Sequence, residues 1–114
     1  MPVTTKLLHG SWQLVDWSVG LGEDLYFYID FDTATMRFAS VDNIGSMYAS
    51  HKSGTFTLTQ ERERYLLSGT YDNGVGDWQH SYEVVAHDND HILWRVAKSG
   101  EVMSFERVES IPEL

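Results

Sequence analysis

The residues that could do chemistry are the histidines, the acidic side chains and the aromatic rings. Two histidines flank an acidic turn, His87-Asp88-Asn89-Asp90-His91, which is the densest group of potential metal ligands. A structural zinc site needs four ligands in a fixed geometry, and no third and fourth ligand is fixed elsewhere in the chain. Asp and Asn are also ordinary turn formers. We therefore expect neither a metal site nor a cofactor.

Catalytic patterns are not found in the sequence. It contains no nucleophile elbow, phosphate loop or His-Glu-x-x-His motif, and the chain has no cysteine, which excludes disulfides and thiolate chemistry. Asp16 and Asp30 could face inward as a carboxylate pair that shares a proton, or both could lie on the solvated face. The sequence thus favours a protein that is not an enzyme.

Charge and length narrow the possible partners. The 114 residues fit a single domain, residues 1–114. A formal net charge of -9 argues against nucleic acid or an anionic membrane as a partner, because both require a basic surface. No signal-peptide or transmembrane run is seen. We expect a cytoplasmic protein as supplied, or a secreted or periplasmic one if a leader was removed.

The elements that must position these residues are short strands. β-branched and aromatic residues alternate with polar ones, and Gly, Asn or Asp interrupts the alternation. After one helical turn at Thr4–His9, the pattern predicts strands at 11–18, 25–31, 35–41, 54–59, 65–71, 78–86, 91–97 and 101–108. Residues 42–53 have no clear period and could form a bulged strand, a short helix or a lid. The fold class is all-β, an eight-stranded antiparallel up-and-down β-barrel.

Five short segments, in this order, carry a family resemblance: Gly10-Ser11-Trp12, Ser68-Gly69-Thr70-Tyr71, Tyr82-Glu83-Val84-Val85, Ile92-Leu93-Trp94 and Phe105-Glu106-Arg107. With them the chain resembles the lipocalin-like (calycin) family, and most closely its compact bacterial lipocalin-like domains. The resemblance implies a barrel floor at Gly10, Trp12 and Arg107, with the arginine packed across the indole. It also implies a barrel that binds a small, mostly apolar molecule. The chain lacks the C-terminal helix of larger members.

Aromatic side chains predicted to face inward are the candidate ligand contacts. The chain has four Trp, six Tyr and five Phe, and such rings can line a pocket or fill a core completely. If the barrel is hollow, we expect a small hydrophobic ligand to contact four aromatic side chains of the wall, Phe38, Tyr71, Tyr82 and Trp94. We expect His80 to be its polar contact. Trp78 and Met47 would lie near the mouth.

A protein interface is the alternative function. If 25–31 turns Phe27 and Ile29 inward, then Tyr26 and Tyr28, with Val15 and Trp17 of the neighbouring strand, form an outward aromatic patch. Such a patch suits a homodimer or an inhibitor-type interface. A single bulge would reverse this orientation and make the same side chains pocket lining, so both readings stay open.

Overall fold

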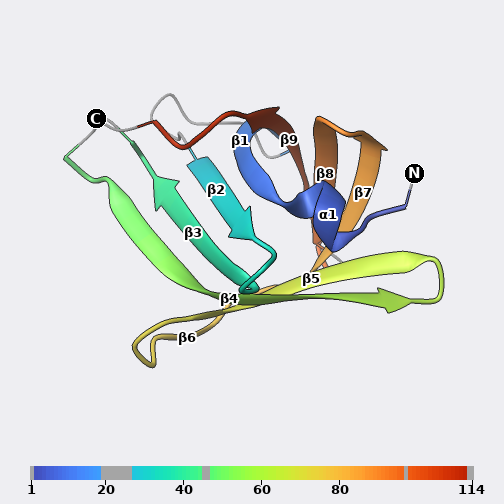
Figure 1. Cartoon of the computed structure of the whole chain (residues 1–114), viewed down its shortest axis with the longest axis horizontal. Helices are drawn as coiled ribbons and strands as arrows, with labels where there is room; N and C mark the ends of the chain where they lie inside the picture. Colours follow the sequence, from blue (N-terminus) through green and yellow to red (C-terminus); the bar gives the residue numbers. More distant parts are fainter. Residues whose placement is uncertain (1, 19–26, 45–46, 97, 113–114) are drawn as a thin grey trace.

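The computed structural model describes residues 2–18, 27–44, 47–96 and 98–112, which form a β-barrel preceded by a helical turn (Figure 1). Leu25 and Tyr26, the first two residues of the strand predicted at 25–31, lie outside these ranges. The elements are α1 (Thr5–Leu8), β1 (Gly10–Trp17), β2 (Phe27–Asp32), β3 (Arg37–Asp42), β4 (Ser50–Glu61), β5 (Arg64–Tyr71), β6 (Gly76–Asp77), β7 (Tyr82–Asp88), β8 (His91–Val96) and β9 (Val102–Val108).

Backbone pairing closes the sheet on itself. Around the barrel the order is β1, β2, β3, β4, β5, β7, β8 and β9, and β9 pairs with β1 to complete the ring. Every pairing is antiparallel, as consecutive hairpins require. The predicted eight-stranded antiparallel barrel is confirmed. Closure removes both free edges that an open sheet would expose.

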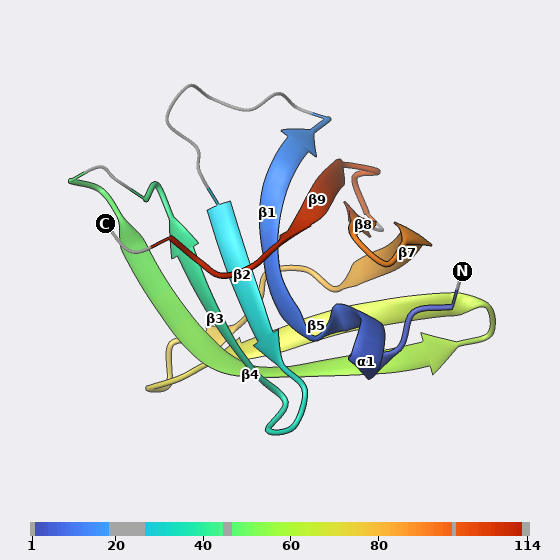
Figure 2. The same cartoon turned by 45° about the horizontal axis from the view of Figure 1, so that its top comes forward.

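The helical turn lies at the end of the barrel where β1 begins (Figure 2). The Thr4 side chain caps it by accepting a hydrogen bond from the Leu7 backbone N–H at 3.1 Å. Leu7 and Leu8 are buried. A four-residue turn is too short to be stable alone, so the burial of these two leucines holds it in place.

Strand β4 is longer than the sequence pattern predicted. Its first residues pair with β3 and its last residues with β5, and Gly54 pairs with both neighbours. A β-carbon at Gly54 would lie 1.9 Å from the Thr70 carbonyl oxygen, so only glycine allows this close approach. The irregular segment predicted at 42–53 is therefore the end of β3, a connection and the start of β4. The pattern missed 50–53 because backbone pairing there uses polar residues.

The strand predicted at 78–86 is divided into two pieces. β6 pairs with β5 at Thr70 and Tyr71, whereas β7 pairs with β5 at Leu66 and Leu67. Between these pairings the Trp78 indole lies against Gly69, where a β-carbon would come within 2.2 Å of the ring. The indole occupies space beside β5 where a regular strand would run. Residues 78–81 therefore belong to neither β6 nor β7.

The half of the barrel near α1 is packed solid. Its fully buried side chains come from most of the strands and include Trp12, Ile29, Phe31, Phe56, Leu67, Ile92 and Phe105. The Phe31 and Phe56 rings meet edge to face at 4.9 Å. Such pairs add to the free energy gained by burying the rings.

Candidate ligand-binding cavity

The closed end of the barrel is built around Trp12. Its side chain is 0% exposed, and its indole N–H donates to the Leu8 carbonyl oxygen at 2.9 Å. Trp12 lies directly opposite Arg107 in the pairing of β1 with β9, and the guanidinium carbon is 4.3 Å from the centroid of the indole ring. The floor residues thus lie together, as the resemblance implied.

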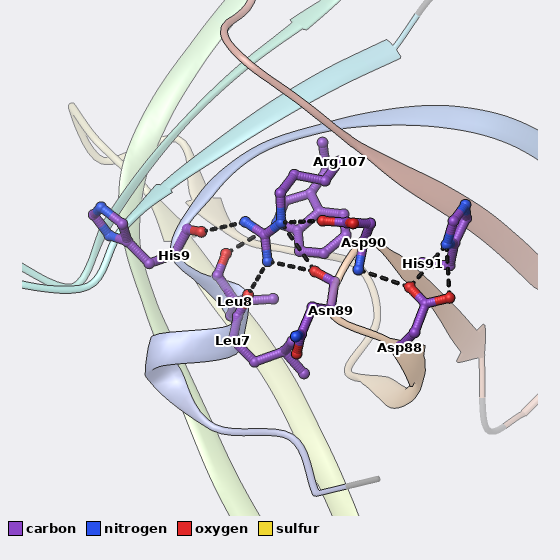
Figure 3. Close-up of polar contacts among 9 residues, drawn as sticks. Leu7, Leu8, His9, Asp88, Asn89, Asp90, His91 and Arg107 are labelled. Carbon is purple, nitrogen blue, oxygen red and sulfur yellow. Dashed lines mark hydrogen bonds and ion pairs between the residues drawn. The ribbon is translucent and has the colours of Figure 1, made fainter.

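Arg107 connects three segments at this end (Figure 3). Its nitrogens donate to the carbonyl oxygens of Leu7 at 2.6 Å, of His9 at 2.7 Å and of Asn89 at 2.8 and 2.9 Å. The same guanidinium pairs with the Asp90 carboxylate at 3.2 Å. The fork of N–H donors is thereby filled with acceptors, which fits a structural role.

Gly10 allows the guanidinium to come this close. Its φ is +113°, and a β-carbon there would lie 3.0 Å from an Arg107 terminal nitrogen. Both the backbone conformation and the space therefore call for glycine. This explains why the third predicted floor residue has no side chain.

The open half of the barrel contains a cavity of about 490 Å³, a size typical of small-molecule sites. Most of its wall is aromatic: Trp17, Phe27, Phe38, Tyr71, Trp78, Tyr82 and Trp94. Its polar lining comes from Ser40, Asp42, Lys52 and Gln79. Leu14, Ile29 and Met103 complete the surface. The aromatic side chains therefore do not fill this barrel completely.

The rings of the wall touch one another in a continuous chain. Phe38 meets Tyr71 at 5.8 Å and Trp78 at 5.1 Å, both edge to face. Trp78 is stacked on Trp94 at 6.1 Å, and Tyr82 meets Trp94 at 5.1 Å. Because each ring is supported by its neighbours, the flat surfaces that face the cavity are held in place.

Two opposite charges lie in the cavity lining. Lys52 Nζ is 3.2 Å from the Asp42 carboxylate and 5.8 Å from the centroid of the Tyr71 ring. The ammonium is thus shared between a carboxylate and an aromatic face. The pair leaves no net charge in this part of the wall.

Burial changes the chemistry of Tyr82. It raises the pKa of the Tyr82 hydroxyl above its usual 10.0, and the nearby Tyr71 and Glu101 raise the pKa further. A phenol with the ordinary pKa of 10.0 is already protonated at neutral pH, and this shift moves its titration further from neutrality. Tyr82 therefore presents a hydrogen-bond donor in the cavity wall.

Comparisons with known proteins do not extend this description. No family model, curated protein or solved structure matches the chain. The family resemblance drawn from the sequence therefore stays a prediction, and function has to be argued from the cavity itself. Among the residues that the structure describes, no helix is long and apolar enough to cross a membrane.

Four of the five predicted ligand contacts line the cavity: Phe38, Tyr71, Tyr82 and Trp94. His80 does not, and the expectation that it points into the barrel is wrong. It lines a separate hollow of about 260 Å³ with Ser68 and Ser81. The reason is the break at 78–81, which ends the alternation that placed His80 beside Tyr82.

The two residues expected near the mouth differ from each other. Trp78 lines the main cavity and also the separate hollow, so its indole stands between the two spaces. Met47, by contrast, is 88% exposed and does not line the cavity. Its position in the connection between β3 and β4 turns it toward solvent.

Of the two orientations that the sequence left open for Trp17, the structure shows the inward one, because Trp17 lines the cavity. A bulge between Leu14 and Asp16 inserts one residue into β1 opposite β9 and reverses the orientation that follows. Val15 and Asp16 are exposed. Strict alternation from Trp12 would have buried Asp16 and exposed Trp17, and that unfavourable combination was the sequence signal for a bulge.

The remainder of the predicted aromatic patch is small. Tyr28 is half-buried and pairs with Gln13 on β1 and Val41 on β3, and it does not line the cavity. Tyr26 lies outside the described residues. With Trp17 turned inward, Val15 and Tyr28 are what the described residues retain of the patch.

The two carboxylates that could have formed an inward pair contact different neighbours. Asp30 accepts a hydrogen bond from the Ser11 hydroxyl at 2.7 Å, whereas Asp16 pairs with Ser104 on the other side of β1. In the described part of the chain no group of three or more acidic or histidine side chains could hold a metal ion.

His91 forms a local ion pair instead. Its Nδ1 lies 2.8 Å from the Asp88 carboxylate in the hairpin between β7 and β8. The hydrogen bond with Asp88 raises the pKa of His91 above its usual 6.5. The pKa of Asp88 is lowered, first by the backbone N–H of Asp90 and then by His91. The cluster therefore stabilises a turn.

Proposed function

We propose that this protein binds a small, mostly apolar molecule inside its barrel and performs no reaction on it. The observation that carries the proposal is the cavity of about 490 Å³ with walls of Phe38, Tyr71, Tyr82 and Trp94. Burying apolar ligand surface against such rings is favourable by roughly 25 cal/mol per Å². The resemblance to lipocalin-like barrels implies the same kind of ligand.

The division of the barrel supports this function. The half near α1 is packed and held together by Arg107, and the wall rings of the open half pack against the same core while leaving the cavity beside them. The space is surrounded by rings that hold one another in position. A rigid, preformed apolar space loses little conformational entropy when a ligand enters.

A neutral fluorescent probe, N-phenyl-1-naphthylamine, tests the proposal. We expect saturable binding by the wild-type protein. Ser40 lies in the cavity wall and is nine-tenths buried, so Ser40→Leu places an apolar side chain in the space and should weaken binding by about tenfold or more. The control is Thr59→Leu, which adds an apolar side chain at an exposed position of β4 where the strand pairs with β5.

Two further measurements complete the test. Trp94→Ala and Tyr82→Ala each remove a wall ring and should also change probe uptake. Native mass spectrometry of the purified protein should show a retained small molecule. Probe binding that is equal in the wild type, Ser40→Leu, Trp94→Ala and Tyr82→Ala would show that the cavity is not the binding site.

A further inference from the structure

Several polar groups in the cavity wall have no partner in the protein. Ser40 is 7% exposed, and its hydroxyl has no hydrogen bond to any described residue. The same holds for the hydroxyls of Tyr71 and Tyr82. None of these three hydroxyl oxygens is fully enclosed, so each can form a hydrogen bond with water or with a ligand that enters the cavity.

Two tryptophans of the same wall show the same feature. The indole nitrogens of Trp17 and Trp94 are buried and have no hydrogen-bond partner among the described residues. Both nitrogens are enclosed by neighbouring atoms, so a ligand in the cavity meets the ring faces and the hydroxyls first.

The charges of the chain exclude one ligand class. Lys52 is already paired with Asp42 in the cavity lining, and the whole chain carries a formal net charge of -9. An anionic ligand would have to approach a negative protein and break that pair. An uncharged ligand avoids both costs.

We propose, resting on the proposed function, that the ligand is a planar, uncharged aromatic molecule that carries a carbonyl oxygen. Its rings lie against the flat faces of Phe38, Trp78 and Trp94, and its carbonyl accepts a hydrogen bond from Tyr82. Ser40, on β3, is the second donor. A carbonyl oxygen accepts hydrogen bonds from such hydroxyls without bringing a charge into the apolar space.

Fluorene and 9-fluorenone form a suitable pair of probes, because they have nearly the same shape and differ by one carbonyl. We expect 9-fluorenone to bind roughly three- to tenfold more tightly than fluorene, as measured by quenching of tryptophan fluorescence. Tyr82→Phe keeps the ring and removes the hydroxyl, so it should bring this ratio close to one. Ser40→Ala should reduce the ratio by a smaller factor.

Tyr65→Phe is the matched control, since Tyr65 packs against the core and does not line the cavity. It should keep the full ratio. Equal affinity of the wild type for both probes would overturn the carbonyl proposal and leave the proposed function standing, whereas no binding of either probe would overturn both. A ratio that survives both Tyr82→Phe and Ser40→Ala would overturn the assignment of the donors. Tighter binding of 9-fluorenone-4-carboxylate than of 9-fluorenone would overturn the uncharged class.

Discussion

Two tryptophans on one strand show how the two ends of this barrel differ. Trp12, at the closed end of β1, has its indole N–H bonded to Leu8 and its ring covered by Arg107. Trp17, at the open end of the same strand, has a buried indole N–H without a partner among the described residues. Their surroundings differ, although both rings point into the barrel.

The two ends differ in whether their polar groups are paired within the protein. At the closed end the polar groups of Trp12 and Arg107 are paired within the chain, and the contacts connect its beginning to its end. At the open end the hydroxyls of Tyr71 and Tyr82 and the two indole nitrogens stay unpaired around a cavity. Leaving the two buried indole nitrogens unpaired costs about 1–3 kcal/mol each. We infer that stability comes mainly from the first region and binding from the second.

The largest effect is expected from Arg107→Ala, which removes the donors that join Leu7, His9 and Asn89. Charged hydrogen bonds contribute about 1.5–3 kcal/mol each and do not add fully, and the contact with Trp12 contributes about 1 kcal/mol more. We expect the free energy of unfolding to fall by about 3 kcal/mol or more. In a chain of this size that lowers the melting temperature by roughly 12 °C.

Arg62→Ala is the control for the same change of side chain. Arg62 is exposed in the turn between β4 and β5, so its loss should change stability by no more than about 0.5 kcal/mol. Arg95 pairs with Glu83 at 3.1 Å on the outer surface, and Arg95→Ala should lower the free energy of unfolding by no more than about 1 kcal/mol. A drop for Arg107→Ala that is no larger than the drop for Arg62→Ala would remove the closed end from its stabilising role.

A smaller effect is expected from Gly10→Ala. Gly10 and Gly76 share an unusual backbone conformation, with φ of +113° and +112°. A β-carbon at Gly10 meets Arg107 at 3.0 Å, whereas one at Gly76 meets nothing within 4 Å. Both variants carry the backbone strain, about 1–3 kcal/mol, and only Gly10→Ala also disturbs the guanidinium. Chemical denaturation should show a greater loss for Gly10→Ala, and equal losses would mean that Arg107 tolerates the added carbon.

Much of the fold, including the closed end of the barrel, could be predicted from the sequence. Alternation of apolar and polar residues separated by turn residues predicts hairpins, and eight such strands predict a closed barrel. The floor of Trp12 and Arg107 was implied by the resemblance to lipocalin-like barrels, through Gly10-Ser11-Trp12 and Phe105-Glu106-Arg107. These features depend on local pattern and on the positions of a few distinctive side chains.

The orientation of Trp17 and His80 could not be predicted in the same way. A bulge in β1 and a break before β7 each shift the alternation, and a shift of one residue turns a side chain to the opposite face. Both irregularities depend on backbone pairing with a neighbouring strand distant in sequence. The extent of the cavity could not be predicted for the same reason. It depends on which aromatic side chains point inward, and the bulge and the break determine this.

The smallest effect at neutral pH is expected from Tyr82→Phe in the open half. The hydroxyl has no partner among the described residues, so its removal breaks no hydrogen bond, and stability at pH 7 should change by no more than about 0.5 kcal/mol. Alkaline pH makes the variant informative. Burial raises the pKa of Tyr82 in the folded state above 10.0, so the unfolded state loses this proton at a lower pH than the folded state does. The free energy of unfolding is therefore unaffected by Tyr82 ionisation below pH 10 and falls as the pH rises through the pKa of the folded state.

The wild type should therefore lose more stability than Tyr82→Phe between pH 10 and higher values, as followed by urea denaturation at each pH. Tyr65→Phe, which packs against the core outside the cavity wall, keeps Tyr82 and should follow the wild type over this range. If Tyr82→Phe instead destabilises the protein by more than about 1 kcal/mol at pH 7, the hydroxyl has a partner within the fold. The open end would then be paired like the closed end, and the contrast between Trp12 and Trp17 would no longer separate stability from binding.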